Sequence, residues 1–159
     1  MGDRVKVKAE VGGDINSFIG DLENYKDHIE EISRRAIYDG AKVLADQIRK
    51  SIEKLDTSGR TKDYEVDGLL DGLGVTPMKQ NGQRIDAKIG MHGYNKHKTT
   101  KYPQGQPNAM IARSIESGTS FRRAQPFIAP TVSRYKDQAE HAMSEEFDRQ
   151  TRKYMKEEV

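Results

Sequence analysis

Residues 109–132 read AMIARSIESGTSFRRAQPFIAPTV, and this stretch decides how we expect the second half of the chain to fold. The stretch begins with apolar residues at helical spacing, and Gly118 follows them. Glycine tolerates the left-handed backbone conformation that commonly ends a helix. Pro126 and Pro130 disfavour helix at the residue before each of them. Pro130 also suits the first turn of a following helix, where no N–H is needed. The stretch therefore predicts a helix, a fixed corner and a second helix, with Phe127 as a buried anchor.

A long helical stripe precedes this region. Apolar residues recur every three or four positions from Ile15 to Leu55, which indicates about ten turns of helix with one apolar face. The stripe fits either a single helix or a short helix over 14–22 followed by a long one over 24–55. Gly40 lies within the stripe, where a small residue marks a point at which another backbone comes close. The alternative is that Gly40 only lowers the helix propensity, at about 1 kcal/mol.

Three further elements are predicted from local patterns. Residues 4–10 alternate between apolar and charged side chains, as in a strand with one buried face. Residues 66–73 contain three leucines that fit a short turn of helix. A last helix is expected from about Pro130 to Lys156, with apolar residues at helical spacing along one side.

A hairpin is predicted around Asn81-Gly82, because both central positions of a type I′ turn require positive φ. A two-residue turn at this dipeptide pairs Gln80 with Gln83. Pro77 lies in the first strand and cannot donate a backbone hydrogen bond, which predicts a free edge or a bulge there.

These elements predict one α+β domain over residues 1–159. A small antiparallel sheet of about three or four strands would be covered on one face by a long N-terminal helix and a long C-terminal helix, because so few strands cannot bury themselves without helices. Residues 92–107 contain no acid and show no periodicity, so they predict a long, mobile basic loop.

The composition narrows the class of protein. The chain has 159 residues, of which 33% are charged, and its formal net charge is +2. A net charge so close to zero gives no overall field for binding a polyanion. The absence of cysteine excludes disulfide scaffolds and thiolate metal sites. No apolar run reaches the length of a membrane span, and residues 1–11 lack the apolar segment of a signal peptide. We therefore expect a soluble protein without membrane contact.

Candidate catalytic and metal sites are weak. His92 and His97 share the basic loop, but a metal needs three or more convergent ligands. The acids Asp71 and Glu116 have no base paired with them by sequence spacing, and motifs for nucleotide binding or a nucleophile elbow are absent. We expect no catalytic residues, no metal, no cofactor and no enzyme activity. Glu116 is expected to cap a turn or to pair with one of three arginines, Arg113, Arg122 or Arg123.

The basic loop has a second interpretation. Its lysines alternate with Tyr94 and Tyr102, which resembles a small patch for binding a nucleic-acid backbone. The near-neutral net charge and the lack of a recognition helix argue against an independent DNA-binding protein. The candidate DNA or partner contacts are Lys96, Lys98, Lys101, Arg122 and Arg123.

The ordered combination in residues 108–132 resembles the signature of a family of small tail components of long-tailed bacteriophages, named after the gene-10 product of a lambdoid phage. In that family a Glu-aromatic-Gly-Thr corner is followed by Ala-x-Pro-Phe-(Ile/Leu)-x-Pro-Ala and a terminal helix. This chain has Ser117 where the family carries the aromatic residue. The matching corner and anchor residues are Glu116, Gly118, Thr119, Pro126, Phe127 and Pro130.

The resemblance implies a virion structural protein, assembled in the bacterial cytoplasm, with a role in head–tail joining or tail completion. Such a protein would form a ring of roughly six or twelve copies at the neck or the upper end of the tail, since ring contacts close by rotation. Its implied partners are copies of itself, neighbouring neck and tail proteins, and DNA passing through the channel. A tail terminator that caps the tail tube is the alternative within this class. A small DNA-binding or regulatory protein is the alternative from another class.

Overall fold

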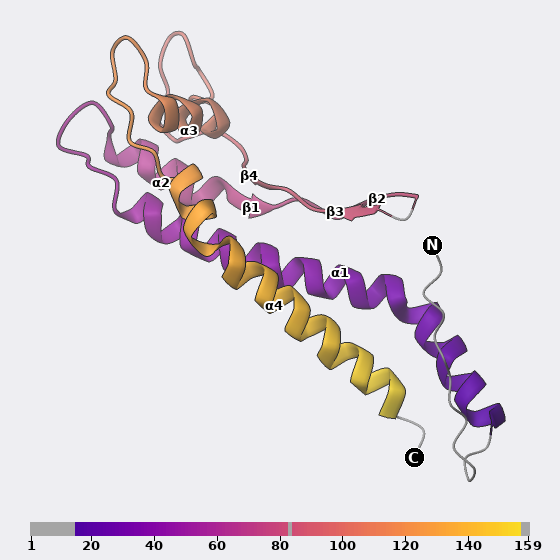
Figure 1. Cartoon of the computed structure of the whole chain (residues 1–159). Coiled ribbons are helices and arrows are strands. Elements are labelled where there is room, and N and C mark those ends of the chain that lie inside the picture. The colour runs from indigo at the N-terminus through magenta and orange to yellow at the C-terminus, as the bar shows by residue number, and fades with distance from the viewer. Residues whose placement is uncertain (1–14, 83, 157–159) are drawn as a thin grey trace.

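The computed structural model describes residues 15–82 and 84–156 (Figure 1). The expected strand over 4–10 lies outside the described residues. The elements in chain order are α1 (Ile15–Glu53), α2 (Asp63–Gly72), β1 (Leu73–Val75), β2 (Lys79–Asn81), β3 (Arg84–Asp86), β4 (Ile89–Met91), α3 (Asn108–Ser117) and α4 (Ala129–Lys156).

Two long helices dominate the molecule. The helices α1 and α4 pack against each other in opposite directions and form what we call the arm, while α2, α3 and the strands β1 and β4 gather around the end of α1 and the start of α4 (Figure 1). We call this second part the head. The expected α+β class, with a few antiparallel strands and long N-terminal and C-terminal helices, is confirmed. The stripe from Ile15 is one continuous helix, which settles the choice between one helix and two.

The four strands form two antiparallel ladders, β1 with β4 and β2 with β3. The last pair of the β2–β3 hairpin is Asn81 with Arg84, so the expected pairing of Gln80 with Gln83 is wrong. The physical reason is that Asn81 stays in the strand, and Gly82 takes the positive φ of 61° as the first residue of the connection.

A bulge separates the two ladders. The N–H of Thr76 donates to the Lys88 carbonyl at 2.7 Å, and the Lys88 N–H donates to Thr76 Oγ1 at 2.9 Å. Beyond this pair, Pro77 and Met78 stand opposite the single Ala87 before the β2–β3 ladder begins. Proline fits here because it has no N–H to offer the ladder, so the sequence expectation of a free edge or a bulge at Pro77 is met by a bulge.

One apolar cluster holds the head together. It combines the C-terminal part of α1 with α2, α3 and the corner that leads into α4. Its buried members are Ile48, Ile52, Leu69, Leu73, Ile111, Ala112, Ile115 and Phe127. Phe127 is 3% exposed, so the residue between the two prolines is part of the core.

The arm interface contains buried apolar side chains and small residues that let the two helices approach closely. Ile32 and Ala36 of α1 and Ala139 of α4 are buried. A Cβ atom at Gly40 would overlap the side chain of Met143 and would come within 3.1 Å of the Ala139 carbonyl oxygen. Gly40 therefore marks a close approach of the two helices, as the stripe predicts.

Two polar side chains of α4 are also buried in the arm, and the apolar stripe does not reveal them. Gln150 is 2% exposed and donates from Nε2 to Glu146 Oε1 at 2.7 Å. Hydrogen bonds from the Arg149 guanidinium hold the pKa of Glu146 below its ordinary value. Arg35 of α1 donates to Gln150 Oε1 at 3.5 Å, so this polar cluster links the two helices.

Burial of Phe127 gives the first prediction. Phe127→Ala should lower the free energy of unfolding by about 3–5 kcal/mol, because it removes a large apolar side chain and leaves a cavity. Urea denaturation measures the change. The matched control is Phe121→Ala, because Phe121 is 80% exposed and an exposed substitution should change stability by less than about 0.5 kcal/mol. Equal effects at the two positions would show that the corner is not part of the core.

Candidate functional site

The corner between α3 and α4, residues 116–131, contains a glycine that its geometry requires directly after α3. Gly118 has φ 73°, a conformation that side chains other than glycine rarely adopt. A Cβ at this position would also lie 2.9 Å from the Ala124 nitrogen and 3.0 Å from the Arg122 carbonyl oxygen. The absence of a side chain therefore lets the chain fold back closely on itself directly after α3.

The carboxylate of Glu116 joins the two halves of the corner. Its two oxygens accept hydrogen bonds from the backbone N–H groups of Phe127, Ile128 and Ala129, at 2.7, 2.8 and 2.9 Å. Ala129 is the first residue of α4, and Phe127 and Ile128 directly precede it. At this end of a helix no earlier turn supplies an acceptor, and the helix dipole favours a negative charge. The next residue, Pro130, has no N–H. Glu116 is expected to cap a turn or to pair with an arginine, whereas its carboxylate caps the start of the next helix, α4.

A tight turn projects from the corner. The N–H of Thr119 donates to the Arg122 carbonyl at 2.8 Å, and the Arg122 N–H donates back to the Thr119 carbonyl at 3.3 Å. The Phe121 N–H donates to Thr119 Oγ1 at 3.2 Å. This turn holds the aromatic ring of Phe121 in solvent, where it is 80% exposed.

Arg122 ties the corner to α2. Its Nη2 lies 2.7 Å from Glu65 Oε1, and the two side chains are only 10% and 4% exposed. The other Glu65 oxygen accepts the backbone N–H of Lys62 at 2.8 Å and so caps α2. Arg122 is thus enclosed in an ion pair, which corrects its expected role as a surface contact for DNA or a partner. Arg123 is exposed.

Gln125 ties the corner to the segment that follows α1. Its Oε1 accepts the Asp56 N–H at 2.9 Å, and its Nε2 donates to the Asp56 carbonyl at 3.2 Å and to Thr61 Oγ1 at 3.3 Å. Hydrogen bonds from the hydroxyl and the N–H of Ser58 hold the pKa of Asp56 below its ordinary value. The corner is therefore fixed on both sides.

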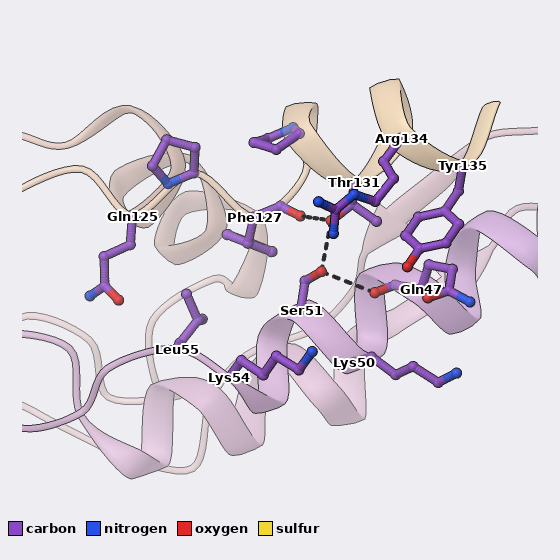
Figure 2. A pocket seen from close by; sticks show the side chains of 12 residues that line it. Gln47, Lys50, Ser51, Lys54, Leu55, Gln125, Phe127, Thr131, Arg134 and Tyr135 are labelled. Atoms are coloured by element: carbon purple, nitrogen blue, oxygen red, sulfur yellow. Dashed lines mark hydrogen bonds between the residues drawn. The ribbon is translucent and has the colours of Figure 1, made fainter.

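A cavity of about 640 Å³ lies beside the corner, between the last turns of α1 and the first turns of α4 (Figure 2). Its charged lining residues are Lys50 on α1, Lys54 just after the end of α1 and Arg134 on α4, and no acid is among the residues that line it. None of the three cations forms an ion pair with another residue of 15–82 or 84–156. We call this site the basic cavity.

Two hydroxyl groups link the walls of the basic cavity. Ser51 Oγ of α1 and Thr131 Oγ1 of α4 lie 2.7 Å apart (Figure 2). Ser51 Oγ also lies 3.1 Å from the Gln47 carbonyl oxygen, and Thr131 Oγ1 lies 2.7 Å from that of Phe127. The hydroxyl groups of Ser51 and Thr131 each have one hydrogen to donate. Only two of these three contacts can therefore be hydrogen bonds at any moment.

The loop over 92–107 is more structured than its composition suggests. Tyr94 and Pro107 form a bridge at its base. The buried Asn95 accepts backbone N–H bonds from His97 and Gln106, both at 3.2 Å. The expectation of a loop without fixed structure is therefore corrected, because a buried side-chain amide supplies the bonds that periodicity does not. The three lysines of the loop, Lys96, Lys98 and Lys101, are exposed.

Neither a metal-binding group of side chains nor a membrane-spanning helix is found among the described residues. Within 15–82 and 84–156, no three residues of the types His, Cys, Asp or Glu are grouped so that they could hold a metal ion. In the same ranges no helix combines the length and apolarity that crossing a membrane requires. The chain matches no protein-family model, no curated protein and no solved structure.

Loss of the Glu116 cap gives a second prediction. Glu116→Ala should lower the free energy of unfolding by at least about 2 kcal/mol, because three backbone donors lose a charged acceptor. Glu116→Gln should cost less, because the amide keeps one acceptor oxygen. Urea denaturation measures the loss, and amide exchange at Ile128 and Ala129 locates it. Glu140→Ala on the exposed side of α4 is the control. A Glu116→Ala variant as stable as this control would disprove the capping role.

The neighbouring arginines give a third prediction. Arg122→Ala should destabilise the fold by about 3–5 kcal/mol, because it leaves Glu65 buried without its cation. Arg123→Ala should change stability by less than about 0.5 kcal/mol, because Arg123 is exposed. Thermal melts of both variants make the comparison. Equal and small effects would mean that the ion pair is open in solution and that Arg122 is free to contact a partner.

Proposed function

We propose that this chain is a structural subunit of a long-tailed bacteriophage particle. It forms a ring at the head–tail junction or at the upper end of the tail, and its role is head–tail joining or tail completion. It acts through contacts between protein surfaces, without catalysis and without a cofactor. Its partners are further copies of itself, neighbouring neck and tail proteins, and DNA in the channel.

The observation that carries the proposal is the network at the corner. The resemblance to the phage family rests on two short patterns separated by several residues. Glu116 belongs to the first pattern and binds the backbone of Phe127 and Ala129 in the second. Residues that carry the resemblance thus serve one physical task, the fixing of α4 against α3. A chance match of single residues gives no reason for them to meet.

The shape of the chain also supports an assembly role. The arm extends well beyond the head, and in the described residues it is formed mainly by α1 and α4 on each other, with the β2–β3 hairpin touching α1 through Arg34 and Gln80 (Figure 1). A ring subunit needs two different contact surfaces, because ring contacts are heterologous. An elongated subunit places such surfaces far apart, which lets each contact be made by a different neighbour.

Two alternatives remain to be separated from this proposal. A tail terminator would use a similar ring and would differ in its position on the particle. A small DNA-binding or regulatory protein is favoured by one observation, the three exposed lysines of the loop over 92–107. Burial of Arg122 removes one cation from that candidate surface.

Mass spectrometry of purified particles tests the proposal. The protein should be present at low copy, roughly six or twelve per particle, as expected for one closed ring. Electron microscopy of particles labelled at this protein should place it at the neck or the upper tail. Absence from the particles, with the protein found instead in a soluble complex with nucleic acid, would refute the proposal.

A set of lysine substitutions separates the DNA-binding alternative. Replacing Lys96, Lys98 and Lys101 with alanine should leave the weak DNA affinity of the free protein almost unchanged. Tight binding by the free protein, with a steep dependence of affinity on salt that these substitutions reduce, would favour a DNA-binding module. Replacing the exposed Lys79, Lys88 and Lys136 with alanine removes equal charge elsewhere and serves as the control.

A further inference from the structure

The first part of α1 forms a surface that no other described element covers. Tyr154, near the end of α4, stacks on His28 with ring centroids 4.4 Å apart. Residues 15–27 of α1 precede this contact, and Figure 1 shows that part of the helix standing apart from α4. Leu22 is 37% exposed, and Glu23 and Asp27 are exposed. We call the surface formed by Leu22, Glu23 and Asp27 the acidic tip.

The charge of the acidic tip is opposite to that of the basic cavity. Its two acids, Glu23 and Asp27, are exposed, and one lysine, Lys26, lies between them in the sequence. Neither Glu23 nor Asp27 forms an ion pair with another residue of the described chain. The basic cavity has the opposite composition, with Lys50, Lys54 and Arg134 and no acid in its lining.

The spacing of the charges also matches. Glu23 and Asp27 are four residues apart on α1, and Lys50 lies in the last turn of the same helix. Lys54 follows Lys50 by four residues but lies just after the end of α1, where its N–H donates to the Ser51 carbonyl at 3.3 Å. Side chains four residues apart on a helix lie on one face with Cβ atoms about 5–6 Å apart. A helix face that carries Glu23 and Asp27 and lies across the end of α1 brings two carboxylates toward Lys50 and Lys54. Leu22 beside the acids fits the apolar part of the cavity, which includes Leu55 and Phe127.

One copy of the chain cannot make this contact with itself. Glu23 and Lys50 lie on the same helix, 27 residues apart by their numbers, which is roughly 40 Å along the helix axis. We propose that the acidic tip of one subunit docks into the basic cavity of a second copy of this chain. The contact is heterologous, so it builds a ring if the rotation closes and a filament if it does not. The inference rests on the proposed function and identifies the contact between neighbouring subunits of the ring, which we call the joint.

Disulfide trapping tests the joint directly, because the native chain has no cysteine. Leu22→Cys marks the acidic tip and Gln47→Cys marks the cavity wall, and both changes keep all five charges. Full-length copies carrying one change each, with different tags, are mixed and oxidised mildly. We expect a disulfide between the two different copies at low salt and at least tenfold less at 1 M salt, where charges are screened. Gln104→Cys, exposed on the basic loop, replaces Gln47→Cys in the control.

Charge reversal provides an independent measurement. Lys50→Glu with Lys54→Glu, or Glu23→Lys with Asp27→Lys, should each weaken self-association at least tenfold in analytical ultracentrifugation. Mixing the two reversed variants should restore association, because each tip then meets a cavity of opposite charge. Circular dichroism melts of both variants confirm that these exposed substitutions leave the fold intact.

The outcomes separate this inference from the proposed function. Rings seen by electron microscopy without trapping of the tip on the cavity would overturn the inference and leave the ring. Trapping that yields only open filaments would support the joint and refute the ring. A symmetric disulfide between two Leu22→Cys copies in place of the mixed product would overturn the inference. Loss of particle incorporation on reversing the cavity but not the tip would also overturn it, and would assign the cavity to another acidic protein.

Discussion

The cap that the carboxylate of Glu116 forms on the backbone before α4 is the interaction on which the rest of the structure depends. The carboxylate receives three consecutive backbone N–H groups at the beginning of α4. Because those N–H groups have no acceptor within their own helix, the cap determines where α4 starts and in which direction it leaves the head. The arm is formed only if that direction brings α4 onto α1. The Glu116 side chain thus fixes the direction in which α4 leaves the head, while α1 runs continuously through both parts.

The other ties of the corner keep this geometry fixed. Arg122 is held by Glu65 of α2, and Gln125 is held by the backbone of Asp56 after α1. Phe127, in the same segment, packs into the apolar cluster of the head. Polar and apolar contacts therefore act on successive residues of one short segment. A corner held from several sides changes little when a partner binds, which suits a subunit that assembles by surface complementarity.

The same corner forms one wall of the basic cavity. Residues 125–127 and the first turns of α4 face the last turns of α1 across it. The cavity is basic because the three charged side chains that these elements contribute are all cations. The opposite charge lies at the far end of α1, in the acidic tip. Both ends of one long helix therefore carry the charges that the proposed joint between subunits uses, and the length of the helix keeps them from meeting within one copy.

Local rules in the sequence were sufficient for much of the fold. Helical spacing predicts α1 and α4, glycine and proline predict the limits of the corner, and the position of Pro77 predicts the bulge. These features depend on the conformations that one residue and its near neighbours allow. Gly40 belongs with them, since a glycine on an apolar helical stripe indicates a close neighbour.

Other features depend on residues distant in sequence, and only the tertiary structure decided them. The sequence leaves Glu116 with two roles and offers Arg122 as a surface contact, whereas packing places Arg122 on Glu65, which sequence reasoning does not single out. The register of the β2–β3 hairpin differs from the predicted one, because Asn81 belongs to the strand and not to the turn. The basic cavity brings α1 together with α4, and no local pattern joins Lys50 to Arg134. Hydrogen bonds and ion pairs require two groups to meet, and the folded chain alone determines which groups do so.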